Sequence, residues 1–336
     1  MKDVKVAIVG FGGIARAHYT GYKILAGEGA PIRLVAVCDI DAAKFDSPVK
    51  INIGGEEEKL AEHIHRYTDI DQMLANEEFD MADICLPSYL HKDYTVKMLN
   101  AGKHVLCEKP MALSGEQCEE MIASAKANGK KLMIGQCLRF IESYLFLKKC
   151  VDEGTYGKMK NIFMDRRSPQ PRWGFEHWFE RTDKCGGCIL DMHIHDVDMA
   201  RFLLGEPYAV SVISTDGDVR WQVENTRLYY KDTMVVINGS WGESPSTSFY
   251  AGFRARFERA TVTSENGVTV YPDDGKSFSP ELPNTNHMAE EIRFFASTIL
   301  GETVNEKNTP ESACATVKLI EKLRESADAN GAIVEV

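Results

Sequence analysis

The chain has 336 residues, 44% of them hydrophobic and 26% charged, so it can bury a large core, and its length favours two domains. Acidic residues outnumber basic ones by 50 to 39 and the net charge is -11, which disfavours binding to nucleic acid or to an anionic membrane surface. Because the sequence has neither a secretory apolar region nor a run of about 18 apolar residues, we expect a soluble, cytoplasmic protein.

The first third of the chain alternates short apolar strands with amphipathic helices. The expected strands cover residues 4–10, 32–39, 81–87, 103–110 and 130–137. The expected helices cover residues 14–29, 69–76, 89–102 and 114–129. Continuous apolar strands separated by helices predict a parallel sheet covered on both faces. We therefore expect a doubly wound domain over residues 1–136.

The sequence pattern changes after Gln136. Longer runs that alternate apolar and polar residues cover 158–167, 208–216, 225–241 and 253–275, and they predict a mostly antiparallel sheet. Helices are expected over 138–154, 186–205, 287–302 and 309–331. We expect residues 137–336 to form a second α/β domain, which is the candidate for substrate binding.

The stretch GFGGIA follows the first strand and opens the first helix. Gly10 permits a tight turn, Gly12 lets the backbone approach a pyrophosphate, and Ala15 lets helix and strand pack closely. The positive end of the helix then faces the phosphates. The predicted cofactor-binding residues of this loop are Gly10, Phe11, Gly12, Gly13 and Ile14.

Asp39 ends the second strand, where this fold places a carboxylate that accepts a hydrogen bond from a ribose 2′-hydroxyl. A carboxylate repels a 2′-phosphate, so NAD is favoured over NADP. Lys44 is close enough in sequence to leave NADP open. The alternative is that Asp39 only caps a loop.

The stretches CLPSYLH and CEKP follow two strands that should lie near the point where the strand order reverses, which is where open α/β sheets bind ligands. We therefore expect Pro87, His91, Glu108 and Lys109 at the cofactor crevice. Pro110 restrains the backbone of Lys109, whose ammonium group could polarise a substrate oxygen; the alternative is a solvated surface cation.

The nine residues DMHIHDVDM, Asp191 to Met199, contain three aspartates and two histidines. If this segment is helical, Asp191 and His195 stand one turn apart on the same face, and His193 points elsewhere. A carboxylate beside an imidazole can hold its N–H and raise its basicity, which suits a general base. The alternative is a structural helix with acids on its surface.

A metal site is a further alternative, because Cys185 and Cys188 lie just upstream of His193 and His195 and CxxC with two histidines resembles zinc-ligand spacing. The two histidines diverge on a helix, however, and the gap is shorter than in zinc fingers. The chain has nine cysteines, and we interpret them as reduced, mostly buried thiols. We expect no metal.

Taken together, GFGGIA, the strand end at Asp39, the EKP of Glu108 to Pro110, and GGCILDMHIHD resemble the Gfo/Idh/MocA family of nicotinamide-dependent oxidoreductases. The resemblance spans nearly the whole chain with the motifs in order. It implies an N-terminal Rossmann domain and a C-terminal α/β domain with an open, mostly antiparallel sheet, which often mediates homodimers or homotetramers in the family.

Carried over to this sequence, the resemblance implies that Lys109 contacts the substrate hydroxyl, with a Lys109–Pro110 peptide bond that can be cis. It implies that Asp191 binds substrate and that His195 accepts the proton. Two features depart from the family pattern. Residues 47–66 form a longer segment than usual, and His193 and the cysteines are not family hallmarks.

These residues predict an NAD(P)-dependent dehydrogenase that acts on a secondary alcohol of a sugar, cyclitol or related polyol. Aromatic and guanidinium side chains of the second domain are candidates for substrate binding or for a packed loop: Arg139, Arg166, Arg167, Arg172, Trp173, His177 and Trp178. Two other functions remain open, namely a glycosidase or epimerase that uses NAD transiently and a regulator that only binds the nucleotide. The joint presence of Lys109, Asp191 and His195 favours an enzyme.

Overall fold

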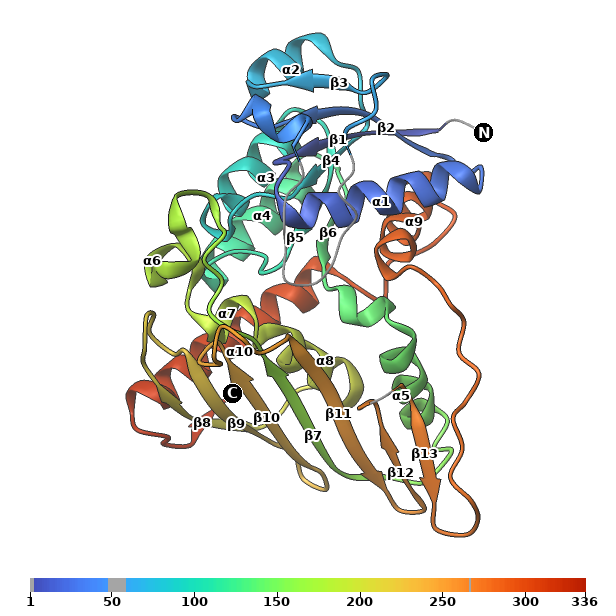
Figure 1. The fold of residues 1–336 in the computed structure, drawn as a ribbon, viewed down its shortest axis with the longest axis vertical. Helices are drawn as coiled ribbons and strands as arrows, with labels where there is room; N and C mark the ends of the chain where they lie inside the picture. The colour runs from blue at the N-terminus through green and yellow to red at the C-terminus, as the bar shows by residue number, and fades with distance from the viewer. Residues whose placement is uncertain (1–2, 48–58, 266) are drawn as a thin grey trace. The chain divides into compact units, whose positions relative to one another are not determined.

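The computed structural model describes residues 3–47, 59–265 and 267–336 (Figure 1). Most of the long segment after Asp39, residues 48–58, lies outside the described residues. The chain divides into two compact units, the first formed by Met1–Cys137 with Thr285–Cys314 and the second by Leu138–Asn284 with Ala315–Val336.

The first unit is built on a six-stranded sheet in the order β3-β2-β1-β4-β5-β6, in which all the neighbouring strands are parallel. Its strands are β1 (Val4–Val9), β2 (Ile32–Cys38), β3 (His65–Tyr67), β4 (Met81–Ile84), β5 (His104–Glu108) and β6 (Leu132–Gly135). The order reverses between β1 and β4, as in doubly wound nucleotide-binding sheets. The predicted fold class is confirmed for this unit.

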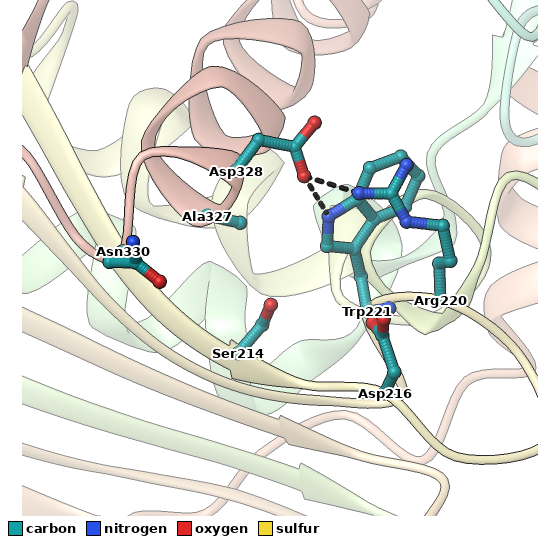
Figure 2. Close-up of a pocket in the computed structure, with 7 residues that line it drawn as sticks. All are labelled: Ser214, Asp216, Arg220, Trp221, Ala327, Asp328 and Asn330. Atoms are coloured by element: carbon teal, nitrogen blue, oxygen red, sulfur yellow. Dashed lines mark hydrogen bonds and ion pairs between the residues drawn. The ribbon is translucent and has the colours of Figure 1, made fainter.

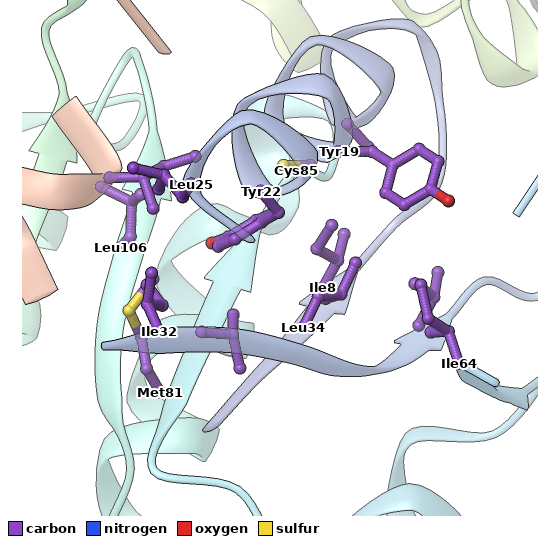
Figure 3. Packing of buried hydrophobic residues seen from close by; sticks show 14 of the residues in the cluster. Ile8, Tyr19, Tyr22, Leu25, Ile32, Leu34, Ile64, Met81, Cys85 and Leu106 are labelled. Carbon is purple, nitrogen blue, oxygen red and sulfur yellow. The ribbon is translucent and has the colours of Figure 1, made fainter. Parts of the chain in front are cut away.

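The helices of the first unit connect its strands. They are α1 (Gly13–Gly27), α2 (Ile70–Asn76), α3 (His91–Asn100) and α4 (Gly115–Ala127), with short 3₁₀ turns η1 (Ala42–Phe45) and η2 (Ser88–Leu90). Parallel crossovers are right-handed, so the helix that leads from β1 to β2 and the helices that lead from β4 to β6 cover opposite faces of the sheet. Beneath α1, residues such as Ile8, Leu25 and Leu106 form a buried apolar cluster (Figure 3).

Helix α9 (His287–Leu300) belongs to this unit although it lies far along the chain. It packs on α1, where its Ile292 and Phe295 join the buried cluster. Gly21 of α1 permits the close approach, because a Cβ at that position would lie 3.1 Å from Ile292 Cδ1 and 3.2 Å from the backbone N of Ala289. These contacts join Thr285–Cys314 to the N-terminal part, whereas the division expected from the sequence places this segment with the second part.

The second unit contains an eight-stranded sheet in the order β13-β12-β11-β7-β10-β9-β8-β14. Its strands are β7 (Met159–Arg167), β8 (Ala209–Thr215), β9 (Val223–Tyr229), β10 (Met234–Ser240), β11 (Tyr250–Phe257), β12 (Ala260–Thr263), β13 (Thr269–Pro272) and β14 (Val334–Glu335). The β7–β10 pair is parallel, and the other pairs are antiparallel. The predicted open, mostly antiparallel sheet is confirmed.

The helices of the second unit are η3 (Cys137–Phe140), α5 (Glu142–Asp152), η4 (Phe175–Glu180), α6 (Thr182–Cys185), α7 (Cys188–Asp191), α8 (Ile194–Leu204) and most of α10 (Pro310–Asp328). Of these, α7 and α8 pack against the sheet, α5 packs on α8, and α6 packs on α7. The strands alternate buried and exposed residues, and outward side chains such as Phe163, Met234 and Tyr250 are exposed. Over the described part of the chain, each helix is too short or too polar to cross a membrane.

Candidate functional site

The glycine-rich turn joins β1 to α1 in the first unit. Gly10 has a φ of 87°, and a Cβ there would lie 2.7 Å from the carbonyl oxygen of Cys85. A side chain at this position would therefore face both an unfavourable backbone conformation and a backbone atom. The N–H of Gly10 donates to the carbonyl of Cys38 at 2.8 Å, which fixes the turn against β2.

Gly12 differs from Gly10, because its φ of -81° suits any residue. A Cβ at Gly12 would have no atom within 4 Å among the described residues. The protein's own packing therefore does not require glycine here, whereas a ligand that approaches the backbone does. Gly12 precedes the first turn of α1, whose N–H groups attract phosphate, so the turn fits a dinucleotide pyrophosphate.

Asp39 lies just after β2 and is buried. Its Oδ2 accepts from the backbone N–H of Phe11 at 2.7 Å, and Lys44 Nζ lies 3.0 Å from both carboxylate oxygens. Asp39 thus holds the glycine-rich turn and also carries a cation beside it. Its expected contact with a ribose, and the preference for NAD over NADP, stay predictions.

The next candidates follow β4 and β5, and Pro87 is the residue just before the η2 turn. The ring nitrogens of His91 lie 2.7 Å from the carbonyl oxygen of Pro110 and 2.8 Å from that of Leu86, so the buried imidazole ties the two strand ends together. The Lys109–Pro110 peptide bond is cis. The half-buried Lys109 follows Glu108, whose Oε2 accepts from the Lys109 N–H at 3.0 Å.

Behind this strand end lies a group of buried polar residues that the sequence reasoning missed. His18 of α1 contacts the carboxylates of Asp83 on β4 and Glu108 on β5, at 2.9 Å each. An acidic residue inside the apolar strand Met81–Ile84 was the available signal, because a buried charge needs a partner.

In the second unit, the stretch Asp191–Met199 is not one continuous helix. Helix α7 ends at Asp191 and α8 begins at Ile194. Between them, the N–H of His193 donates to the carbonyl of Cys188 at 2.9 Å, five residues back, instead of the four that an α-helix uses. The expectation that Asp191 and His195 stand at regular spacing on one helix is therefore corrected: the register shifts between them.

Two acids of this stretch have structural partners. Asp196 binds Arg166, with Nε to Oδ2 at 2.7 Å. Asp198 binds Arg139, with Nε to Oδ2 at 2.8 Å and a second contact of 2.7 Å. All four groups are buried, so each charge is paired inside the core and does not face water.

The histidines of the stretch lie in different surroundings. His193 is fully buried beside Thr226, with its Nε2 2.8 Å from the hydroxyl, and burial lowers its pKa to about 3. Asp191 is buried with 8% exposure. Within Asp191–Met199, which the structure describes in full, His195 is the one residue that is not buried. It is therefore the group of this stretch that a ligand can reach.

Two of the residues predicted to bind substrate, Arg139 and Trp178, lie in packed surroundings. The guanidinium of Arg139 is 2% exposed and forms the ion pair with Asp198. Trp178 is 8% exposed and stacks on Phe179, with ring centroids 3.8 Å apart. Packing alone accounts for both side chains, and their contact with a substrate stays a prediction.

The CxxC pair has the properties of structural thiols. Cys185 and Cys188 are fully buried, and burial raises the pKa of Cys185 to about 12 and that of Cys188 well above its ordinary value. Between the two cysteines, Gly186 and Gly187 have φ values of 79° and 80°, which form a tight turn.

One pocket of about 540 Å³ lies in the second unit between the β8–β9 connection and the end of α10 (Figure 2). Its lining residues are Ser214, Asp216, Arg220, Trp221, Ala327, Asp328 and Asn330. Asp328 binds Arg220 at 2.6 Å and the indole N–H of Trp221 at 3.3 Å. The predicted site residues are not among those lining it.

Two family models match the chain. Residues 4–136 match an oxidoreductase family with an NAD-binding Rossmann fold, and residues 144–270 match the GFO/IDH/MocA C-terminal domain.

Several known proteins are similar over much of their length. An inositol 2-dehydrogenase of Rhizobium meliloti is 33% identical over 316 residues, which are 88% of each protein. A 2,7-anhydro-N-acetylneuraminate hydratase of Mediterraneibacter gnavus is 30% identical over 251 residues, 73% of this chain but only 60% of the hydratase. The WlbA dehydrogenase from Bordetella pertussis, crystallised with NADH and UDP-GlcNAcA, has a TM-score of 0.79 at 19% identity, covering 100% of this chain and 99% of that one.

The structural similarity to WlbA shows the fold, and the sequence matches show the family. The glycine-rich turn described above is the part of the first unit that fits a dinucleotide. The chain therefore belongs to the Gfo/Idh/MocA oxidoreductase family, and its first unit contains an NAD-binding Rossmann domain.

Proposed function

We propose that the protein oxidises a secondary alcohol of a sugar, cyclitol or related polyol with NAD, and that His195 accepts the hydroxyl proton. The observation that carries this proposal is the accessibility of His195 within a stretch whose other residues are buried. A general base must reach its substrate. The name of the inositol 2-dehydrogenase relative supports a polyol as the substrate class.

Each residue has a separate task in this proposal. His195 removes the proton from the hydroxyl oxygen, and Asp191 binds the substrate and orients the imidazole. The ammonium group of Lys109 stabilises the negative charge that develops on that oxygen. Bound NAD supplies the acceptor for the hydride that leaves the carbon, so that the alcohol becomes a ketone. That Lys109 and His195 act on the same substrate oxygen stays a prediction.

The test is a panel of inositols and sugars, beginning with myo-inositol, with NAD or NADP and with absorbance of the reduced nicotinamide as the readout. General-base assistance contributes about 10²–10⁴-fold, so His195→Ala should lower kcat by that order while NADH affinity stays near the wild-type value. A His195→Ala variant with the kcat of the wild type would remove the proposed role of His195.

A second candidate function is a reaction in which NAD is reduced and reoxidised within one turnover, as in a glycosidase or epimerase. The hydratase name of one relative favours keeping it. A dehydrogenase accumulates one NADH for each polyol consumed. A transient-redox enzyme converts its substrate while free NADH stays constant, so product analysis beside the absorbance measurement separates the two.

A further inference from the structure

The buried polar residues behind β5 of the first unit are connected to the backbone of Lys109. His18 of α1 is fully buried, with Nδ1 2.9 Å from Asp83 Oδ2 and Nε2 2.9 Å from Glu108 Oε1. A carboxylate oxygen only accepts hydrogen bonds, so each ring nitrogen needs its own proton to make both bonds. The geometry therefore requires a protonated imidazole between two carboxylates.

The electrostatics agree with this protonation state. Burial by itself acts to lower the pKa of His18, but the charge of Asp83 prevails and the pKa lies well above its ordinary value of 6.5. Burial likewise acts to raise the pKa of Glu108, yet its hydrogen bond with His18 holds that pKa below the ordinary value. One cation thus stabilises two buried anions.

Both carboxylates bind further groups that fix them in place. The Tyr22 hydroxyl of α1 donates to Asp83 Oδ2 at 2.7 Å, and Figure 3 shows Tyr22 and Cys85 on the side of α1 that faces the sheet. The N–H of Lys109 donates to Glu108 Oε2 at 3.0 Å. The connection therefore runs from α1 through His18 and Glu108 to the backbone of Lys109.

The neighbouring strand leaves room for this arrangement. Gly135 of β6 is paired with Glu108 in the sheet, and a Cβ at Gly135 would lie 2.9 Å from Glu108 Oε1. That oxygen is the one His18 binds. A larger residue at position 135 would displace the carboxylate from the imidazole.

A metal ion is the alternative for this cluster, because single ligand atoms of His18, Asp83 and Cys85 lie within 4.8 Å of one another. The hydrogen bonds of the cluster disfavour it. His18 Nδ1 and Asp83 Oδ2 bind each other, the Tyr22 hydroxyl donates to the same oxygen, and the Cys85 thiol lies 3.6 Å from Asp83 Oδ1.

We propose that His18 is a positioning residue that joins the nucleotide-binding helix α1 to the backbone of Lys109 through Glu108. This inference rests on the proposed function, because it assumes that Lys109 acts on the substrate. Removal of the imidazolium leaves Glu108 without its cation, and the peptide N–H of Lys109 then loses a fixed acceptor. A displacement of about 1 Å can cost about 100-fold in rate.

The first experiment is NMR on the full-length protein with ¹⁵N-labelled histidine, and it needs no substrate. At about pH 8, where a free imidazole is neutral, His18 should show two ring N–H signals that disappear in His18→Gln. In Glu108→Gln the new amide can donate to Nε2, so one ring N–H should remain. A single His18 N–H in the wild type, or two in Glu108→Gln, would overturn the proposed charge state. The ionisable groups that interact electrostatically with the His18 imidazole are Asp83, Cys85, Glu108, His287 and Glu291.

The second experiment is a double-mutant cycle between His18→Gln and Lys109→Ala, measured with NAD and myo-inositol. We expect His18→Gln to lower kcat about 10- to 100-fold in the wild-type background and less than about threefold in the Lys109→Ala background, since effects through one group are not additive. NADH affinity, measured by fluorescence, should change less than about threefold in His18→Gln. Equal losses in both backgrounds would overturn the positioning role.

Tyr19→Phe is the matched control, because Tyr19 is a buried neighbour on α1 whose hydroxyl instead accepts from the N–H of Ala61 at 3.1 Å. Its kcat should stay at the wild-type value. If Lys109→Ala alone keeps full kcat, the proposed role of Lys109 fails while the NMR result on His18 still stands. If Lys109→Ala loses activity and His18→Gln does not, the positioning role alone fails.

Discussion

The two glycines of the nucleotide-binding turn should respond to alanine in opposite ways. Gly10→Ala places a side chain at a φ of 87° and 2.7 Å from the Cys85 carbonyl oxygen. Gly12→Ala places one at a φ of -81°, with no atom within 4 Å among the residues that the structure describes. The first change should therefore damage the fold, and the second should damage only cofactor binding.

The structure sets the size of both effects. At Gly10, the left-handed conformation costs about 1–2 kcal/mol and the forced backbone shift adds about 1–3 kcal/mol, so the free energy of unfolding should fall by about 2–5 kcal/mol. At Gly12 the free energy of unfolding should stay within about 0.5 kcal/mol, because the reduced freedom of the unfolded chain offsets a slightly poorer helix cap. Loss of one hydrogen bond to a phosphate, about 1.5–3 kcal/mol, should weaken NADH binding about 10- to 100-fold.

Urea unfolding and NADH fluorescence titration on both variants test this contrast. The reasoning is refuted if Gly12→Ala binds NADH as tightly as the wild type, or if it loses as much stability as Gly10→Ala. In the first case the backbone at Gly12 does not approach the pyrophosphate. In the second case glycine serves internal packing at both positions.

Two further predictions concern buried charges. Arg139→Met leaves Asp198 without its cation and should lower the free energy of unfolding, measured with urea, by about 3–5 kcal/mol. The control is Lys322→Met in the exposed pair with Glu325, which should leave the urea midpoint unchanged. A stable Arg139→Met protein that binds polyol poorly would instead mark Arg139 as a substrate residue. Because the pKa of folded His18 is raised above 6.5, its stabilisation is complete below that pH and is lost as the pH rises through the folded-state pKa. The difference in unfolding free energy between the wild type and His18→Gln should therefore shrink as the pH rises above about 6.5, and a difference that grows would contradict the charged state.

The sequence predicted five strands of the first unit's sheet, because they are largely buried and the helices between them have apolar stripes. It missed the short edge strand β3, whose residues His65 and Arg66 are exposed. The pattern of apolar residues along α9 does not, however, predict which element α9 packs against. Ile292 and Phe295 show only that one face of α9 is buried, and their partner, α1, lies far away in the sequence. The glycine at position 21, which makes room for α9, is a common residue with no distinctive pattern around it.

Sequence reasoning on the second unit identified Asp191 and His195 as candidates but missed the break between them. The segment has helical spacing throughout, and the register shift lies at His193, a residue with close tertiary contacts. His193 lies against Gly239 of β10, where a Cβ would come within 2.6 Å of its Nδ1. Such a contact between distant residues cannot be read from local periodicity. The role of Arg139 in pairing with Asp198 was missed for the same reason.

The assignment of Thr285–Cys314 to the first unit limits how the protein can be dissected. A fragment that stops near residue 136 lacks α9 and should expose the apolar side of α1 to water, a surface that promotes aggregation. A soluble nucleotide-binding fragment would need both pieces, joined by a short designed linker or expressed together. The nucleotide-binding unit consists of two chain segments and therefore has four ends, whereas a continuous domain has two. Transferring it into another protein requires a design for each of these ends.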